Sequence, residues 1–395
     1  MDRIGIFGGT YNPPHLGHVQ AAVYGKNALK LDKLYLIPSH ISPHKVLPDG
    51  SPTPQQRLEM VRLAACDTDL VVSDIELSRG GASYTYQTVL SLREIHPDSQ
   101  IYLMMGTDMF LTLDSWREAE LLLSMVIPVV FYRGDKAERE RVEEKKAEFA
   151  SKGVSAIVME NPVTEISSTQ LRRMLVFGCA APFLSEEVHT YILQNRLYGT
   201  GESYIGLPMD KLEKVVTSLV NPNRIAHILG CRDTAVALAK RWGADETDAA
   251  RAGLLHDITK ALDGPLQLTV CQEYGMVLDD FSRENPKTLH AYTGAMVAER
   301  IFGENPAVVS AIHSHTTGKA GMNILEKIIY VADYMEPNRK FPGVEELRQA
   351  AFSDIDRAME MGLEMTLDLL KKEGKVISVA SQEALCDIKR HLERR

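Results

Sequence analysis

Two groups of residues whose types and spacing could do chemistry lie in opposite halves of this 395-residue sequence. In the first, a short apolar run from Ile4 to Phe7 leads into Gly8-Gly9-Thr10-Tyr11-Asn12-Pro13-Pro14-His15-Leu16-Gly17-His18. An amphipathic pattern follows, so we predict a strand, a loop and a helix in that order. Glycines let a backbone approach a ligand closely, and the free N–H groups of a helix N-terminus attract anions. With His15 and His18 on one face of the first helical turn, the stretch indicates a site for a nucleotide phosphate.

A second set of anion-binding groups is predicted in the string Ile166-Ser167-Ser168-Thr169-Gln170-Leu171-Arg172. Ser167 and Gln170 have the spacing of a capping box, which explains most of the string as the start of a helix. The capping box does not explain the run of three hydroxyl side chains with Arg172 one turn inside the helix. Hydroxyls, free N–H groups and a guanidinium at one helix start form a site for an anion.

The residues in the other half of the sequence have side chains that bind transition metals. The pair His256-Asp257 ends an apolar helical run, so its polar side chains point inward, where they need a partner. Further imidazoles and carboxylates occur on both sides of this pair, at His227, His290, His313, His315 and Asp333. One such histidine is more often a satisfied or exposed side chain, but the set indicates a metal site. Imidazole with carboxylate suits Fe, Mn, Ni or Zn, and the sequence does not choose among them.

The pattern of residues 1–160 predicts the frame that holds the first group. Runs typical of strands occur at 3–7, 33–37, 70–75, 101–105, 126–132 and 154–159, with helical patterns between them at 54–66, 84–95, 115–123 and 136–150. This alternation predicts a Rossmann-like α/β fold, in which helices cover both faces of a parallel sheet. Ligands in such folds bind beyond the carboxyl ends of the strands, where residues 8–18 fall.

Only helical patterns follow residue 159, and 185–196 is predicted to be the last helix of the first domain. Residues 198–208 contain three glycines and a proline without periodicity, which is the composition of a linker. Beyond them we expect only helices, at 209–219, 222–242, 246–262, 265–274, 288–302, 305–313, 323–335, 344–352 and 354–372. The predicted organisation is an α/β domain at 1–200, a linker at 201–208 and an all-α domain at 209–395.

Composition excludes several classes of function. The net charge of −9 argues against a broad surface for nucleic acid or an anionic membrane. The five cysteines are scattered and form no CxxC pair, which fits a reducing compartment. The N-terminus lacks the apolar region of a signal peptide, and the longest apolar run, 121–132, falls short of the ~18 residues that a membrane span needs. We therefore expect a cytoplasmic protein.

The string at 8–18 resembles the signature of the nucleotidyltransferase superfamily, and the string at 166–172 resembles that family's second signature. The likeness is strongest to nicotinate-nucleotide adenylyltransferase and covers residues 1–200, although Asn12 stands where Asp is commoner. Shorter segments, at 38–45, 83–88 and 106–108, also match. The resemblance implies transfer of AMP from ATP to nicotinate mononucleotide, giving nicotinate adenine dinucleotide and pyrophosphate, with Mg²⁺ bridging phosphate oxygens.

The same resemblance implies roles for single residues. The acceptor phosphate is already an anionic nucleophile, so catalysis needs positioning and stabilisation of charge. The implied catalytic residues are His15, His18, Lys45 and Arg172. The implied ATP-binding residues are Gly8, Gly9, Thr10, His15, His18, Gly106, Asp108, Ser167, Ser168, Thr169 and Arg172. The nicotinate nucleotide would contact Thr85, Trp116 and Arg133, although Trp116 taken alone is more typical of a core side chain.

The spaced His, His-Asp and Asp of the second half resemble the HD superfamily of metal-dependent phosphohydrolases. The strings at 311–318, 325–333 and 336–339 are similar to the YqeK-type branch, which cleaves diadenosine tetraphosphate symmetrically to two ADP. The resemblance covers 209–390 and implies a divalent transition metal, Fe or Mn, held by His227, His256, Asp257 and Asp333. In some HD enzymes further histidines bind a second ion, so the number of ions stays open. It implies that nucleotide and phosphate contact Lys260, His290, His315, Thr316 and Arg339. His313 stands where that branch has another residue, so we do not expect it to be a ligand.

The sequence therefore predicts one bifunctional chain acting on ATP, nicotinate mononucleotide and diadenosine tetraphosphate, without nucleic acid or membrane as partner. Two alternatives stay open. The first domain could use another phosphate acceptor, such as pantetheine phosphate or nicotinamide mononucleotide. The second could be a non-hydrolytic nucleotide-binding module that regulates the first. The sequence leaves open whether the chain forms a homo-oligomer and whether the two sites are coupled.

Overall fold

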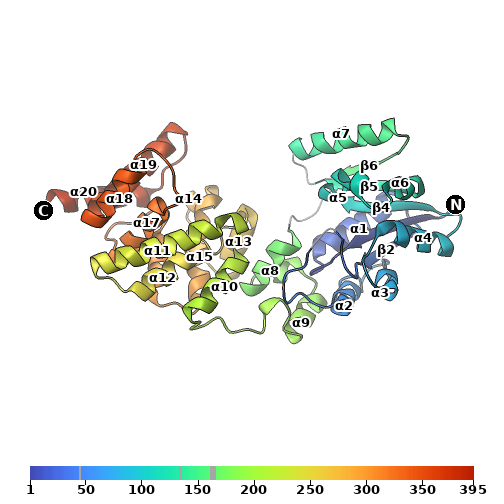
Figure 1. The fold of residues 1–395 in the computed structure, drawn as a ribbon, viewed down its shortest axis with the longest axis horizontal. Helices are drawn as coiled ribbons and strands as arrows, with labels where there is room; N and C mark the ends of the chain where they lie inside the picture. Colours follow the sequence, from blue (N-terminus) through green and yellow to red (C-terminus); the bar gives the residue numbers. More distant parts are fainter. Residues whose placement is uncertain (44–45, 133–135, 161–165) are drawn as a thin grey trace. The chain divides into compact units, whose positions relative to one another are not determined.

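The computed structural model describes residues 1–43, 46–132, 136–160 and 166–395. These residues form two compact units, Met1–Glu202 and Ser203–Arg395 (Figure 1). The first unit contains every strand of the described chain, and the second is helical. In the described ranges, no helix is both long and apolar enough to cross a membrane.

The first unit is built on a six-stranded sheet in which every pairing is parallel. Its strands are β1 (Arg3–Gly9), β2 (Lys33–Pro38), β3 (Val71–Val72), β4 (Gln100–Gly106), β5 (Val126–Tyr132) and β6 (Ile157–Glu160). The strand order is β3-β2-β1-β4-β5-β6, so the direction of winding reverses between β1 and β4. Ligands of open α/β sheets bind at such a reversal, beyond the carboxyl ends of the strands. The predicted α/β fold is confirmed.

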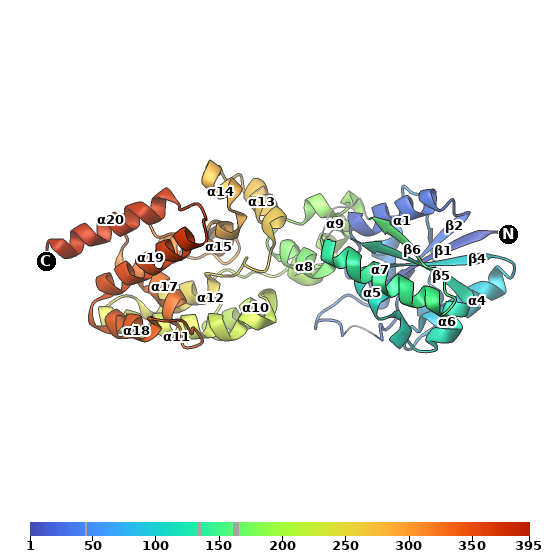
Figure 2. The same cartoon turned by 90° about the horizontal axis from the view of Figure 1, so that it is seen from above.

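Helices cover both faces of this sheet, and each face has its own apolar core. One core joins the strands to residues of α4 (Thr85–Ile95), α5 (Thr107–Leu111), α6 (Ala119–Met125) and α7 (Lys136–Ser151). The other joins them to residues of α1 (Leu16–Ala28) and α2 (Pro54–Ala64). The two views show α1 and α7 on opposite sides of the strands (Figures 1 and 2). Both faces are apolar, which is why the strands read as continuous hydrophobic runs. The unit also contains α8 (Ser168–Val176) and α9 (Glu186–Gln194).

Departures from the predicted elements lie at the sheet edge, after β4 and in the second unit, where α14 (Asp280–Glu284) and α20 (Val379–Glu393) were not predicted and the helix expected at 246–262 ends at Leu255. Only Val71–Val72 of the expected strand 70–75 pairs with the sheet, and the chain then turns into α3 (Ile75–Arg79). The helix expected at 115–123 begins at Ala119, because Glu118 has a left-handed backbone with φ of 55°. The short helix α5 was not predicted, since five residues carry too little periodicity to detect.

The second unit is all-α, as predicted. Its helices are α10 (Met209–Leu219), α11 (Ile225–Trp242), α12 (Glu246–Leu255), α13 (Gly264–Glu273), α14 (Asp280–Glu284), α15 (Leu289–Arg300), α16 (Pro306–Ser314), α17 (Ile324–Met335), α18 (Val344–Ser353), α19 (Ile355–Lys372) and α20 (Val379–Glu393). Helices α11, α12, α16 and α17 pack against one another, and α15 packs on α16. Their apolar faces are buried in this packing, while their ends bring polar side chains together.

Most of the expected linker 201–208 lies on the second unit. Tyr204 is buried, and its ring centroid lies 5.8 Å from that of Phe302. Arg251 donates to the Leu207 carbonyl at 2.9 Å, while its guanidinium pairs with buried Glu304. On the other side of the boundary, the Tyr198 hydroxyl donates to Asn12 Oδ1 of the first unit at 2.8 Å. Both ends of the connection are therefore anchored within their own units.

We predict that Met1–Glu202 and Ser203–Arg395 fold as separate fragments, because each has its own apolar core. Each should give one cooperative thermal transition followed by circular dichroism. A first fragment shortened to residue 196 serves as the matched control, and we expect it to melt at a lower temperature because it lacks Tyr198 and buried Leu197. A fragment without a cooperative transition would show that the two units depend on each other.

Candidate active sites

A cavity of about 680 Å³ opens at the carboxyl ends of β1 and β4, where the sheet reverses. Strand β1 delivers the glycine-rich loop to it, and β4 delivers Gly106 and Asp108. The start of α8 lines the same cavity, although it lies more than 150 residues after β1 in the sequence. A Cβ placed on Gly8 would meet no protein atom within 4 Å, so a ligand has room against the backbone there.

All thirteen residues predicted for this site that the structure describes line that cavity. They are Gly8, Gly9, Thr10, His15, His18, Thr85, Gly106, Asp108, Trp116, Ser167, Ser168, Thr169 and Arg172. Trp116 is half-buried, and it packs against the sheet core in addition to lining the cavity. It therefore has both of the positions considered from the sequence, in the core and at the ligand site. Lys45 and Arg133 lie outside the described residues. The cavity brings the residues together, and their individual roles stay predictions.

His15 and His18 lie against each other at the start of α1. Their ring centroids are 3.6 Å apart, and His15 is the residue that precedes the helix. The His15 backbone N–H donates to His18 Nδ1 at 3.2 Å. Because Nδ1 accepts a hydrogen bond, a neutral His18 carries its proton on Nε2 and presents that atom as a donor. A donor next to free helix N–H groups is what an anionic ligand requires.

Two arginines from different helices hold the loop between β1 and α1. Arg57 of α2 is 1% exposed and donates to the carbonyls of Thr10 and His40, at 2.7 and 2.9 Å. Arg172 of α8 donates to the Asn12 carbonyl at 2.7 Å. The Ser168 hydroxyl adds a bond to the Pro13 carbonyl at 3.1 Å. Arg172 therefore holds the loop in addition to its predicted role toward phosphate.

The capping box predicted for the second signature is confirmed. The Ser167 hydroxyl accepts from the Gln170 N–H at 3.2 Å, and Gln170 Oε1 accepts from the Ser167 N–H at 3.1 Å. These bonds set where α8 begins. Ser168 and Thr169 then lie in the first turn of the helix and face the cavity.

Sequence reasoning missed Arg57 and a buried polar group around Glu76. Glu76 lines the cavity and accepts from the Thr88 hydroxyl at 2.7 Å, and burial raises the pKa of its carboxyl. The Ser83 hydroxyl accepts from the His40 N–H at 2.9 Å, which ties the loop after β2 to the start of α4. Neither Arg57 nor Glu76 belongs to a motif. Both lie in segments with several other polar or charged residues, so the sequence carried no signal that singled them out.

We predict that His18→Ala leaves the fold intact and lowers kcat for adenylyl transfer by at least ~10²-fold, the effect of losing one transition-state donor. Steady-state kinetics, with circular dichroism as a folding check, measure this. Tyr24→Phe, on the same helix and partly exposed, is the matched control and should keep full activity. An unchanged kcat in His18→Ala would rule out the phosphate role of His18.

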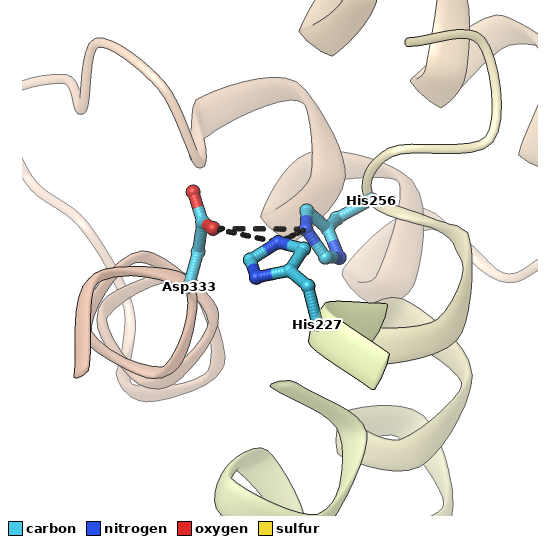
Figure 3. Close-up of side chains that lie close together, drawn as sticks. All are labelled: His227, His256 and Asp333. Atoms are coloured by element: carbon cyan, nitrogen blue, oxygen red, sulfur yellow. Dashed lines mark hydrogen bonds and ion pairs between the residues drawn. The ribbon is translucent and has the colours of Figure 1, made fainter. Parts of the chain in front are cut away.

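In the second unit, the four predicted metal ligands converge from three helices. His227 lies in the first turn of α11, His256 and Asp257 follow the end of α12, and Asp333 lies on α17. His227 Nε2 is 3.3 Å from His256 Nε2 and 3.2 Å from Asp333 Oδ1. Figure 3 shows these three side chains directed toward one point. Asp257 Oδ2 completes the set, 3.6 Å from His227 Nε2 and 3.5 Å from His256 Nε2.

The histidines around this point all place Nδ1 away from the centre and Nε2 toward it. The Nδ1 atoms of His256, His290 and His315 contact backbone carbonyl oxygens at 2.8, 2.8 and 2.6 Å. Nδ1 of His227 lies 3.1 Å from Glu336 Oε1. With an acceptor at each Nδ1, a ring that carries a single proton holds it there and directs its Nε2 lone pair inward. Nε2 of His315 is buried and has no hydrogen-bond partner among the described residues.

Asp257 divides this cluster into two sides. Its Oδ2 faces His227 and His256, whereas its Oδ1 lies 3.3 Å from His290 Nε2 and 3.8 Å from His315 Nε2. Burial opposes ionisation of Asp257, but the neighbouring imidazoles hold its pKa well below the usual range. On the second side, Lys260 Nζ lies 2.8 Å from His290 Nε2. Burial, His315 and Lys260 lower the pKa of His290 to about 3, so this ring is neutral.

Basic side chains surround the carboxylates of the cluster. Arg339 pairs with Asp333 Oδ1 at 2.7 Å, and Arg224 pairs with Asp257 Oδ2. Thr316 lies one residue beyond His315, and its Oγ1 is buried without a hydrogen-bond partner in the described part of the chain. His313 is exposed and packs its ring on Tyr292, in agreement with its exclusion as a ligand. Arg224 was not among the predicted site residues.

These residues fit a divalent transition metal. A metal with bonds of about 2.1 Å places adjacent ligand atoms about 3 Å apart, close to the 3.2 to 3.6 Å that separate His227 Nε2 from the other three donors. Two imidazoles and two carboxylates suit Fe, Mn or Zn, and the acceptors behind the imidazoles are what metal-binding histidines have. Within the described residues, His256, Asp257 and His315 form a second group of compatible geometry.

We predict one tightly held ion, with His290 and His315 contacting substrate phosphate, because Lys260 and Arg339 already concentrate positive charge beside the cluster. Elemental analysis of wild type and His290→Ala should then find one equivalent in both, with a higher KM for substrate in the variant. His313→Ala is the matched control and should change neither quantity. Two equivalents that fall to one in His290→Ala would show instead that His290 is a ligand.

The folds and sites of the two units define two classes of domain in one chain. A cytidylyltransferase-like family model matches residues 6–174, and an HD domain family model matches residues 224–338. The chain is 36% identical over 198 residues to a Listeria welshimeri protein named "Probable nicotinate-nucleotide adenylyltransferase", covering 50% of this chain and 97% of the relative. It is 36% identical over 165 residues to the symmetrical bis(5'-nucleosyl)-tetraphosphatase of Bacillus subtilis, covering 41% of this chain and 87% of the relative.

The chain therefore belongs to two families, the nicotinate-nucleotide adenylyltransferases through its first half and the symmetrical bis(5'-nucleosyl)-tetraphosphatases through its second. Among solved structures it is similar to an HD superfamily hydrolase from Clostridium acetobutylicum described as involved in NAD metabolism. That similarity has 36% identity and a TM-score of 0.46, and it covers 48% of this chain and 99% of the other.

Proposed function

We propose that this chain is a bifunctional enzyme that makes nicotinate adenine dinucleotide in its first unit and hydrolyses diadenosine tetraphosphate in its second. For the first unit, the observation that carries the proposal is the single cavity lined by both nucleotidyltransferase signatures. For the second, it is the convergence of imidazole and carboxylate donors from three helices on one point. The names of the relatives support both activities.

In the first unit, a phosphate oxygen of nicotinate mononucleotide attacks the α-phosphorus of ATP. A P–O bond to the acceptor forms while the bond to pyrophosphate breaks, so AMP is transferred. No proton has to be removed from the ionised acceptor, and the protein contributes position and charge. His18 donates from Nε2 to the phosphate oxygens, together with the N–H groups at the start of α1. Mg²⁺ bound with ATP would supply positive charge to offset that of the triphosphate.

The remaining cavity residues fix the two reactants. Asp108, in the first turn of α5 and exposed to the cavity, accepts from ribose hydroxyls of the adenosine. Thr85 and Trp116 receive the nicotinate end, with the ring stacking on the indole. The backbone N–H groups of Ser168 and Thr169 at the start of α8, with the Thr169 hydroxyl, add donors for the triphosphate, while the Ser168 hydroxyl donates to the Pro13 carbonyl. Arg57 and Arg172 hold the loop that carries His15, so that these groups keep their spacing.

In the second unit, His227, His256, Asp257 and Asp333 hold a divalent ion, which we propose to be Fe or Mn. When bound, such an ion would lower the pKa of a water and stabilise negative charge on the phosphate oxygens. Lys260, Thr316 and Arg339 bind phosphate oxygens on the open side of the cluster, and the rings of His290, which is neutral, and His315 orient them. Addition of one water across the central P–O bond of the tetraphosphate bridge gives two ADP.

Both activities act on adenine nucleotides, which are found in the cytoplasm, and we propose that the enzyme works there. The alternatives for the first unit are pantetheine phosphate or nicotinamide mononucleotide as acceptor. For the second, the alternative is a module that binds nucleotide without hydrolysing it. The chemical completeness of the donor cluster favours hydrolysis over binding alone.

We predict that the fragment Met1–Glu202 converts nicotinate mononucleotide and ATP to nicotinate adenine dinucleotide, and that Ser203–Arg395 with Mn²⁺ converts diadenosine tetraphosphate to ADP as sole product. Chromatography of nucleotides after reaction measures both. In the full chain, His18→Ala should remove the first activity alone and His256→Ala the second alone.

Several results of this assay would contradict the proposal. Faster turnover of pantetheine phosphate or nicotinamide mononucleotide than of nicotinate mononucleotide would show that the first unit has a different acceptor. Release of AMP and ATP from diadenosine tetraphosphate would exclude symmetrical cleavage. Tight binding of diadenosine tetraphosphate without product would favour the regulatory module.

A further inference from the structure

One of the four inward-facing histidines differs from the others in what lies behind it. His256, His290 and His315 contact the backbone carbonyls of the residues three positions earlier. His227 instead contacts the side chain of Glu336, with Nδ1 and Oε1 3.1 Å apart. A carbonyl fixes only the orientation of a ring, whereas a carboxylate also places a full negative charge next to it.

Glu336 is held so that its carboxylate cannot turn away from His227. The residue is 1% exposed and directly follows α17. Its Oε2 accepts from the backbone N–H and the side-chain amide of Asn338, at 2.7 and 2.9 Å. Arg348 of α18 donates to the backbone carbonyl of Glu336 at 2.9 Å and to that of Met335 at 2.9 Å. The remaining oxygen, Oε1, is directed at His227, which is its nearest partner, and it also lies 4.0 Å from Nε of the half-buried Arg339.

The position of Glu336 links two of the helices that build the cluster. Asp333, one of the four proposed metal ligands, lies three residues earlier on the same helix α17. His227 comes from α11, which packs against α17. A Cβ on Gly230, one turn after His227, would lie 2.6 Å from Glu336 Oε2, so α11 approaches the carboxylate closely there. Helix α17 with the residue after it thus supplies one ligand directly and controls another.

We propose that Glu336 is a positioning residue for the metal centre, which holds the Nδ1–H tautomer of His227 and increases the electron-donating strength of its Nε2. This assignment rests on the proposed metal site. The paired charge of Glu336 makes the imidazole a stronger ligand than one backed by a carbonyl, and partners of this kind contribute about 10- to 100-fold to metal affinity. Glu336 touches neither substrate nor the reacting atoms in this assignment.

The test is the Kd for Mn²⁺ of the full chain, measured by competition with a chelating dye, in wild type and in Glu336→Gln. The amide keeps the shape of the side chain but removes its charge, so we expect a Kd about 10- to 100-fold higher. At saturating Mn²⁺, kcat for diadenosine tetraphosphate should stay within a few-fold of wild type. Glu326→Gln is the matched control, because Glu326 is equally buried in the same unit but pairs with Lys319 and Ser310. Its Kd should equal that of wild type.

A second variant keeps the proposal testable if Glu336→Gln does not fold. Asn338→Ala removes a donor to Oε2 at an exposed position, and it should raise the Kd for Mn²⁺ several-fold with an unchanged melting temperature of the apoprotein. An unchanged Kd in both variants, or an equal rise in Glu326→Gln, overturns the assignment alone. Wild type that binds no Mn²⁺ overturns the metal centre and the assignment together.

Discussion

Asp257 is almost wholly buried, and a buried carboxylate is stable only where opposite charges and hydrogen-bond donors surround it. This constraint organises the second unit. The carboxylate collects His227 and His256 on one oxygen, His290 and His315 on the other, and Arg224 beside the first. Each imidazole in turn needs a hydrogen-bond acceptor at its Nδ1. This requirement determines which groups surround the cluster, namely three backbone carbonyls and the Glu336 carboxylate. The helices of the bundle end or begin where these polar side chains must meet.

The same constraint acts in the first unit through a buried cation. Arg57 is 1% exposed, and its guanidinium is satisfied by the carbonyls of Thr10 and His40. Those carbonyls belong to the loops after β1 and β2, so one side chain sets the spacing of two loops at the cavity. Arg172 and Ser168 add the start of α8 to the same loop. Adenylyl transfer depends on position more than on proton transfer, and such fixed spacing is what the chemistry requires.

The polar groups of the two units serve different purposes. In the first, donors surround an open cavity and no acid or base is required of them, because both reactants are already ionised. In the second, imidazole nitrogens and carboxylate oxygens lie close together around one point. A metal cation can take the place of the protons that would otherwise balance the negative charge of the carboxylates. Both activities handle adenine nucleotides, although each unit has its own core and its own candidate site.

The sequence by itself determined the class of each unit and most of the residues at each site. Alternating apolar runs predicted the parallel sheet, and two signature strings predicted which loop and which helix start would line the cavity, because turns, caps and helix starts depend on neighbouring residues. Only the tertiary structure decided the contacts between distant segments. Arg57 meets Thr10 across 47 positions of sequence, and His227 meets Glu336 across 109. No local period or motif encodes such pairs, since they exist only once helices and strands have packed and a buried charge has found its partner.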